Sequence, residues 1–363
     1  SRERESNLIG AAHTGQQAIS SAENDQGIRA AGLCPLAIRA GERVLREFRS
    51  FRRVVTRRDM SVSPASIRRS NLGEGPHWDP TSKTLLYVDA PVGDLCRLDV
   101  LTKDTSGVHL DGLVTIVIPY KSDPNLNVIT LDRQLRMFDW TTSKSEVLTE
   151  VDSDKPTNKF NDGKCDVTGR LWAGTTGEHK DAEMIQKENG SLFSIDPATL
   201  KVTTHVTKVN LSNGMTWSPD NLSMFYVDSF TRSIYSFGFD AANGQLSNRQ
   251  VLVDFNSKDE YKECGYPDGM TVDVNGKLWI ACYDAGRVIN IDPDTGKLLR
   301  TVLLPVSNTT SCCFGGENYD ELYVTSAWKG LTSEQLSAEP LAGSVFKVTC
   351  LGAKGFAAHT FNR

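Results

Sequence analysis

Short segments in which apolar and polar residues alternate recur along the chain after Met60. Each segment is followed within a few residues by turn-forming residues, which is the pattern of a β-hairpin. The six alternating segments cover residues 95–99, 135–139, 192–196, 235–240, 288–292 and 345–349. Their ends lie 40 to 57 residues apart, with an average of 50. Several short strands repeated at such a period are typical of a β-propeller.

Six of these periods fill the chain after Met60, and no convincing helical periodicity interrupts them. The pattern therefore predicts an all-β fold, a six-bladed β-propeller over residues 60–363. We expect the strand near 61–69 to complete the last blade beside the C-terminal residues and so to close the ring. The tryptophans and most other aromatic residues are expected to pack between blades.

A polar residue followed by glycine precedes the expected innermost strand in four of the repeats. The four pairs are Glu74-Gly75, Asp162-Gly163, Asn213-Gly214 and Asp268-Gly269. Innermost strands surround the central channel of a propeller, so equivalent positions on them direct side chains towards one point near its mouth. We expect Asp162 to point elsewhere and the neighbouring amide of Asn161 to take its place. The side chains of Glu74, Asn161, Asn213 and Asp268 would then form a cluster of oxygen atoms with two negative charges.

Converging carboxylates repel each other unless a cation lies between them, and hard oxygen donors suit Ca²⁺, Mg²⁺ or Mn²⁺. The sequence therefore indicates a divalent-metal site at the mouth of the channel. The alternative is that these polar–glycine pairs are ordinary turns, which recur because the fold recurs. No zinc-protease motif, nucleophile elbow or phosphate-binding loop is present in the sequence.

Composition and charge exclude two classes of partner for the chain as a whole. The longest apolar runs, such as 114–118, have the length of one buried strand and fall short of the roughly 18 to 20 residues that a membrane-spanning helix needs. A formal net charge of −5 argues against nucleic acid. The eight cysteines form no C-x-x-C pair, and we expect buried thiols in a reducing compartment, the cytoplasm.

Residues 1–59 differ from the rest of the chain. They hold 11 arginines, 7 acidic residues and no lysine, a net charge of +4, whereas all 18 lysines lie after Met60. We interpret this segment as a basic N-terminal extension ahead of an ancestral start at Met60. Two alternatives stay open. One is an organellar targeting peptide, because 39–58 is rich in arginine with interspersed apolar residues, and the other is a binding arm.

The polar–glycine motifs and their surroundings resemble those of the regucalcin (senescence marker protein) and gluconolactonase family, which includes luciferin-regenerating enzymes. The similar segments follow one another in order through almost all of 61–363 and leave out 1–59. They include GEGP at 73–76, KFNDGK at 159–164, SNG at 212–214, YPDGM at 266–270, TTSCCFGG at 309–316 and LGAKG at 351–355. The resemblance implies one divalent metal ion at the mouth of the channel, with Ca²⁺ favoured over Mg²⁺, Mn²⁺ or Zn²⁺.

The resemblance also implies roles for individual residues, carried over by motif. The implied metal ligands are Glu74, Asn213 and Asp268, and the implied substrate-binding residues are Lys159, Asn161, Glu178 and His179. Two of these depart from the family, because Lys159 stands where the motif has arginine and His179 stands where regucalcins have a second glutamate. Lysine keeps the charge but loses the bidentate fork of arginine. We therefore expect the metal chemistry to be kept and the substrate preference to have moved.

The implied reaction is the metal-dependent hydrolysis of a lactone, with gluconolactone as the prototype. A metal ion would polarise the carbonyl group and stabilise the developing oxyanion, and Asp268 is the expected base for the attacking water. Two alternatives stay open: a non-enzymatic calcium-binding regulatory propeller, and the same hydrolase fold acting on another substrate, as in luciferin regeneration. We expect a monomer whose partner is a small-molecule lactone, with no nucleic-acid or membrane partner.

A protein that starts at Met60 should fold and keep its activity, because residues 1–59 lack the repeat on which the blades depend. Removal of ten further residues should be harmful, because it deletes the strand expected to close the ring. Solubility, circular dichroism and turnover of the two truncated proteins test both statements. Loss of most activity in the protein that starts at Met60 would show that the extension belongs to the functional unit.

Overall fold

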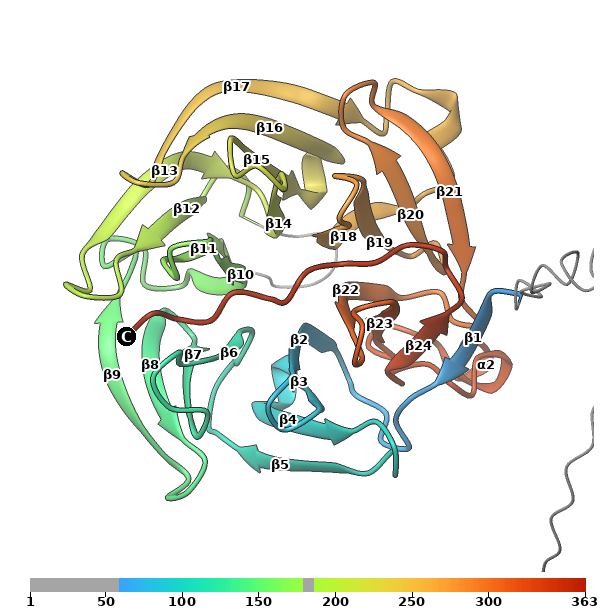
Figure 1. The fold of residues 1–363 in the computed structure, drawn as a ribbon, viewed down its shortest axis with the longest axis horizontal. Coiled ribbons are helices and arrows are strands. Elements are labelled where there is room, and N and C mark those ends of the chain that lie inside the picture. Colours follow the sequence, from blue (N-terminus) through green and yellow to red (C-terminus); the bar gives the residue numbers. More distant parts are fainter. Residues whose placement is uncertain (1–58, 179–185) are drawn as a thin grey trace, which may run out of the picture. The chain divides into compact units, whose positions relative to one another are not determined.

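The computed structural model describes residues 59–178 and 186–363. Residues 1–58, which make up nearly all of the expected basic extension, lie outside the described residues, as does His179. The described strands form six sheets of four antiparallel strands each, arranged as blades around a common centre (Figure 1). The prediction of an all-β, six-bladed propeller is confirmed.

Each blade runs from an inner strand at the centre to an outer strand at the rim. The first two blades are β2 (Gly73–Asp79), β3 (Thr84–Asp89), β4 (Asp94–Asp99) and β5 (Thr105–His109), then β6 (Val117–Pro119), β7 (Leu126–Leu131), β8 (Gln134–Asp139) and β9 (Lys144–Glu150). The third and fourth are β10 (Lys159–Cys165), β11 (Leu171–Thr176), β12 (Gly190–Ile195) and β13 (Val202–Val209), then β14 (Ser212–Trp217), β15 (Ser223–Asp228), β16 (Ser233–Asp240) and β17 (Gln245–Asp254). The last two are β18 (Tyr266–Val272), β19 (Leu278–Tyr283), β20 (Arg287–Asp292) and β21 (Lys297–Leu303), then β22 (Thr309–Gly315), β23 (Glu321–Ser326), β24 (Phe346–Thr349) and β1 (Ser61–Pro64).

The alternating segments of the sequence fall in the third strand of each blade, namely in β4, β8, β12, β16, β20 and β24. The sixth blade is completed by β1, in which Ser61 pairs with Thr349 and Pro64 with Phe346. This pairing confirms the expected closure of the ring, although β1 ends at Pro64 rather than near residue 69. The first and last strands of the propeller are thus held in one sheet.

Few helices connect the strands of the described residues. They are the 3₁₀-helices η1 (Ala90–Val92), η2 (Ser229–Thr231) and η3 (Asp259–Tyr261), and the α-helix α2 (Ser333–Ala338). None of the helices in this part of the chain has the length and apolar character that crossing a membrane requires.

The polar–glycine pairs lie inside the innermost strands, not ahead of them as the sequence suggested. In β2, β10, β14 and β18 the register with the neighbouring strand shifts around the pair, which marks a β-bulge. A bulge bends its strand and redirects the side chains next to it. At Gly214 a Cβ atom would clash with the backbone oxygen of Asp268, so only glycine lets β14 pass this close to β18.

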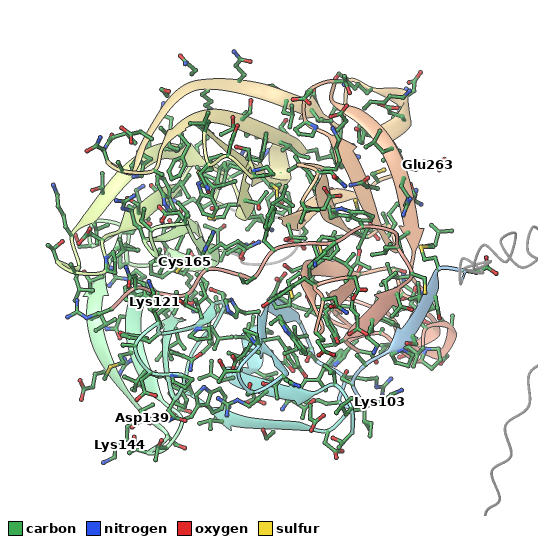
Figure 2. All side chains as sticks on the ribbon, in the orientation of Figure 1. Lys103, Lys121, Asp139, Lys144, Cys165 and Glu263 are labelled. Carbon is green, nitrogen blue, oxygen red and sulfur yellow. The ribbon has the colours of Figure 1, made fainter. Side chains whose placement is uncertain are left out.

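Aromatic residues pack between neighbouring blades, as the sequence predicts. Trp78 of the first blade stacks on Tyr323 of the sixth, with ring centroids 5.5 Å apart. Trp172 and Trp279 are fixed by the same contact in two blades, because each indole Nε1 donates to an aspartate six residues earlier. Side chains at the rim reach solvent instead, as Figure 2 shows for Lys144 on an outer strand.

The residues after β24 cross the centre of the ring (Figure 1). The backbone N–H of Gly355 donates to Tyr319 O of the sixth blade at 2.8 Å, and that of Phe361 donates to Pro119 O of the second blade at 2.9 Å. Between these anchors, residues 356–359 line a central cavity of about 340 Å³ together with later residues of the inner strands. The C-terminal segment 351–363 therefore closes one end of the channel and leaves the mouth at the end where the inner strands begin.

Phe361→Ala should lower the free energy of unfolding by about 3 kcal/mol, because the ring is fully buried and deleting it leaves a cavity. Phe356→Ala is the matched control, since Phe356 lies in the same segment with 45% of its surface exposed. Urea denaturation followed by circular dichroism measures both. Equal effects of the two substitutions would contradict the anchoring of the segment at Phe361.

Candidate functional site

Side chains from four blades converge where the inner strands begin. Asn161 on β10 donates its Nδ2 hydrogen to the backbone oxygen of Ser212 on β14, at 2.8 Å. The amide of the next residue, Asn213, lies close enough to the carboxylate of Asp268 on β18 to lower the pKa of that group. Glu74 on β2 lies near enough to Asp268 for the two charges to influence each other. The structure therefore brings together the four side chains that the sequence placed in one oxygen cluster.

Negative charge accumulates at this point of the channel. Burial, followed by repulsion from Asp268 and Asp162, raises the pKa of Glu74 well above its ordinary value. Burial and repulsion from Asp162 do the same for the pKa of Asp268, against the opposing hydrogen bonds from Asn213 and the Gly269 N–H. A carboxylate in such surroundings is costly unless a cation or a proton offsets its charge.

Asp162 is a third carboxylate of the channel, and it lines the central cavity beside Lys164, whereas Glu74, Asn213 and Asp268 are not among the residues that line this cavity. It is buried and repels both Glu74 and Asp268. Its own pKa is raised by burial, although Lys164 and the N–H of Gly163 oppose the rise. Lys164 donates to the backbone oxygen of Met270 at 2.6 Å and places an ammonium group beside Asp162. This lysine, which the sequence analysis did not single out, offsets one of the three charges.

Two oxygen atoms of the cluster have no hydrogen-bond partner although they are buried: Oδ1 of Asn213 and Oδ1 of Asp268. An unsatisfied buried acceptor costs about 1–3 kcal/mol, and a hard cation bound between these oxygens and Glu74 would remove that cost. No three His, Cys, Asp or Glu side chains of residues 59–178 and 186–363 gather as a metal site. The donors offered here are therefore two carboxylates and an amide, which fits the implied divalent cation.

Ser229 on η2 fixes the amide of Asn213. The hydroxyl of Ser229 accepts from Asn213 Nδ2 at 3.0 Å and donates to the backbone oxygen of Pro267 at 2.7 Å. Because Nδ2 is held in this way, Oδ1 is the atom of the amide that remains available to a ligand. Ser229 also ties β15 to the residue before Asp268, so one hydroxyl positions two members of the cluster.

Aspartates at the ends of the second strands hold the beginnings of two inner strands. Asp89 accepts from the N–H groups of Asn71 and Leu72, just before β2, at 3.0 Å each. Asp228 accepts from the equivalent N–H groups of 210 and 211, just before β14, at 3.0 and 3.1 Å. A Tyr-Val-Asp motif occurs at both 87–89 and 226–228, and this repeat is the sequence signal from which the shared hydrogen bonds could have been predicted.

Lys159 lies near the start of β10, where its Nζ atom donates to Asp132 Oδ1 at 2.8 Å. Both side chains are partly exposed, and the backbone of Asp132 also accepts from the N–H of Phe160. Glu178 is exposed after β11, and its backbone oxygen accepts from the N–H of Gln186. His179 lies outside the described residues, so its expected role stays a prediction.

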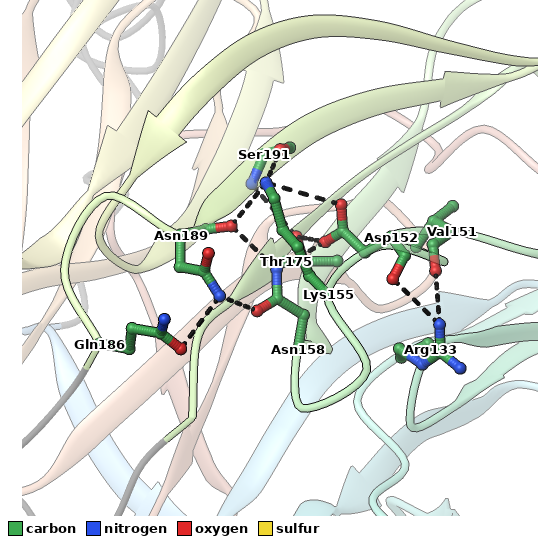
Figure 3. A network of polar contacts seen from close by, with 9 residues as sticks. All are labelled: Arg133, Val151, Asp152, Lys155, Asn158, Thr175, Gln186, Asn189 and Ser191. Atoms are coloured by element: carbon green, nitrogen blue, oxygen red, sulfur yellow. Dashed lines mark hydrogen bonds and ion pairs between the residues drawn. The ribbon is translucent and has the colours of Figure 1, made fainter.

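A buried polar network supports the start of β10 (Figure 3). Asp152 accepts from Asn158 Nδ2 at 2.7 Å and from the Thr175 hydroxyl at 2.6 Å. Asn158 in turn donates from Nδ2 to the backbone oxygen of Asn189 at 2.9 Å and accepts from the Asn189 amide through its Oδ1. The network joins three strands of the third blade directly before Lys159 and Asn161.

Comparison with known proteins places these residues in a family. The family model described as "SMP-30/Gluconolactonase/LRE-like region" matches residues 72–328. The chain is 42% identical to regucalcin of Homo sapiens over 289 residues, which cover 80% of this chain and 94% of that protein. Regucalcin of Gallus gallus is 42% identical over 293 residues, with 81% and 95% of the two chains covered.

Solved structures show the same relationship. A luciferin-regenerating enzyme superposes with a TM-score of 0.78 at 33% identity, over 84% of this chain and all of that chain. A regucalcin from Agrobacterium tumefaciens, described as a calcium-binding protein, superposes with a TM-score of 0.75 at 25% identity, over 84% and 98% of the two chains. A gluconolactonase from Xanthomonas campestris shares the fold, with a TM-score of 0.63 at 17% identity over 80% and 89%.

The stabilisation of the protein by Ca²⁺ should depend on pH. A Ca²⁺ ion at the implied site would need Glu74 and Asp268 as carboxylates, and their pKa values are raised in the fold, so protons would compete with the ion well above the pH at which ordinary carboxyl groups titrate. At a fixed Ca²⁺ concentration, the gain in melting temperature should be largest near about pH 8 and should shrink as the pH falls towards about 5. Differential scanning fluorimetry across this range measures the gain.

A substitution of Glu74 separates the stability of the metal-free protein from its stabilisation by Ca²⁺. A raised carboxyl pKa means that stability is lost as the pH rises through it, so Glu74→Gln should make the metal-free protein more stable at neutral pH. The same substitution should weaken the response to Ca²⁺. Asp111→Asn is the control, because its side chain is fully exposed. If Ca²⁺ raised the melting temperature of Glu74→Gln as much as that of the wild-type protein, and equally at every pH, Glu74 would not be a metal ligand.

Proposed function

Because the chain belongs to the SMP-30/gluconolactonase/LRE-like family, which includes lactone hydrolases, we propose that it catalyses the divalent-metal-dependent hydrolysis of a lactone. The observation that carries the proposal is the pair of unpartnered, buried Oδ1 atoms of Asn213 and Asp268 beside Glu74. A structural turn would satisfy such atoms within the protein, whereas a metal site leaves them free. The proposed partner is a small-molecule lactone, and the proposed cofactor is one divalent cation with Ca²⁺ favoured.

In the proposed reaction, water attacks the lactone carbonyl carbon and the ring C–O bond breaks, so that lactone and water give a hydroxy acid. A divalent cation held by Glu74, Asn213 and Asp268 would act as a Lewis acid towards the carbonyl oxygen and would lower the pKa of water. Asp268 takes the proton of the attacking water at its carboxylate and returns it to the leaving ring oxygen.

In this proposal the other residues of the site orient the substrate or hold neighbouring side chains in place. Asn161 and Lys159 lie at the start of β10, where they would orient polar groups of the substrate. Asp132 keeps the Lys159 ammonium at the rim through its 2.8 Å contact, and Ser229 keeps the amide of Asn213 in place. Asp162 and Lys164 lie deeper, where their opposite charges compensate each other.

Two other functions agree with particular relatives. The regucalcin from Agrobacterium tumefaciens is described as a calcium-binding protein, which would suit a non-enzymatic propeller whose metal is regulatory. The luciferin-regenerating enzyme suits the same fold with another substrate. A screen of lactones with Ca²⁺, Mg²⁺, Mn²⁺ or Zn²⁺ added to chelator-treated protein separates them, because only an enzyme produces acid at a rate that depends on the metal.

Asp268→Asn is the sharpest test of the mechanism. The substitution is nearly isosteric and keeps an oxygen donor, so the melting temperature at saturating metal should change little. Turnover should fall by about 10²-fold or more, the scale of a lost general base, while Asp111→Asn keeps full turnover. A pH-stat assay of acid release measures both. Full turnover by a folded, metal-loaded Asp268→Asn protein would remove Asp268 from the mechanism.

A further inference from the structure

Two exposed aromatic rings stand beside the oxygen cluster. Phe230 on η2 and Tyr266 at the start of β18 each expose 37% of their surface. Their ring centroids are 5.8 Å apart and the rings meet edge to face at 74°. Aromatic rings that stay partly in water offer apolar surface which a ligand can cover. We refer to these two residues as the rim pair.

The backbone places the rim pair at the same end of the channel as the cluster. Phe230 directly follows Ser229, the residue whose hydroxyl holds Asn213 Nδ2 and the backbone oxygen of Pro267. Tyr266 directly precedes Pro267 and lies two residues before Asp268. Each ring is therefore attached within two residues of a group that forms or positions the cluster.

Arg232 supports the pair from the side. Its guanidinium lies 5.9 Å from the centroid of the Tyr266 ring, within the range of a cation–π contact. Its Nε donates to the backbone oxygen of Gly265 at 2.9 Å, and its Nη1 donates to Asn256 Oδ1 at 3.0 Å. Its Nη2 also donates to the backbone oxygen of Lys262 at 3.3 Å, so three hydrogen bonds hold the guanidinium beside the tyrosine ring without any ligand.

We propose that the rim pair is an apolar subsite that receives an alkyl or aryl substituent on the lactone ring. The inference rests on the proposed lactone hydrolysis and names its substrate class: lactones with an apolar substituent rather than polyhydroxylated aldonolactones. A sugar lactone carries hydroxyl groups on most of its carbon atoms and therefore offers less apolar surface to the two aromatic rings than an alkyl chain does. An alkyl chain that covers them contributes binding energy with each added methylene.

A series of γ-lactones with unbranched substituents from methyl to hexyl tests the proposal, with glucono-1,5-lactone as the polar comparison. In the wild-type protein with saturating Ca²⁺, kcat/KM should rise by about threefold per methylene until the pair is covered. In the double variant Phe230→Ala, Tyr266→Ala this rise should disappear, while turnover of the methyl-substituted lactone changes by less than about twofold. Tyr266→Phe, which keeps the ring, should keep the rise.

Phe356→Ala is the matched control, because it removes an exposed aromatic ring from the C-terminal segment, away from the mouth. A flat series in the wild-type protein, or the same rise in the double variant, would overturn the subsite. Equal loss of glucono-1,5-lactone and hexyl-lactone turnover in the double variant would also overturn it, because the rings would then contact the lactone ring itself.

Measuring the affinity of a ligand that is not hydrolysed tests the subsite independently of catalysis. Lactams with the same series of substituents resist hydrolysis, and isothermal titration calorimetry with Ca²⁺ present measures their affinity for the wild-type protein and the double variant. If no lactone is hydrolysed but lactam affinity rises with chain length only when the rim pair is present, the proposed reaction fails and the subsite stands. If lactam affinity depends neither on chain length nor on the rim pair, the proposed subsite is wrong, whatever the turnover of lactones.

Discussion

Closure of the ring is the constraint on which the site depends. Glu74 belongs to the first blade and Asp268 to the fifth, and they approach each other only because the blades form a complete circle. The pairing of β1 with β24 joins the two ends of the propeller in one sheet. The C-terminal segment adds a second link, since it is bonded to the sixth blade at one end and to the second at the other. A site built from four blades is rigid for this reason, because no single strand can move without its neighbours.

The convergence of the inner strands buries negative charge at the mouth of the channel, which is unfavourable for the fold. Three carboxylates influence each other electrostatically, and the fold offsets only part of their charge through Lys164 and the N–H groups of the bulged strands. The remaining charge and the unpartnered oxygens of Asn213 and Asp268 are what the proposed cation would offset. In that case stability and metal affinity would be linked, since the same groups would bind the ion.

In the proposed function, the choice of substrate would be decided farther out, at the rim. The oxygen cluster contains residues held by strand bulges, whereas Lys159 and Tyr266 at the starts of strands and Phe230 on η2 are partly exposed. Changes at these three positions would alter what the proposed site accepts and leave the residues of the cluster in place. The ion pair of Lys159 with Asp132 and the contact of Arg232 with Tyr266 show that this fold nonetheless fixes its rim side chains.

The number and kind of blades could be read from the sequence, because alternation and turn residues act locally and each of the six alternating segments became the third strand of a blade. The convergence of Glu74, Asn161, Asn213 and Asp268 could also be predicted, since equivalent positions of a repeat occupy equivalent places in a ring. The electrostatic influence of Asp162 on Glu74 and Asp268 could not, because it depends on how the bulge turns the strand after Asn161. Lys164, Ser229 and Asp132 were missed for a related reason: each acts through a contact with a strand or loop remote in sequence, and the motif that carries it gives no sign of that partner. Only the packing of blade against blade decides which of these neighbours meet.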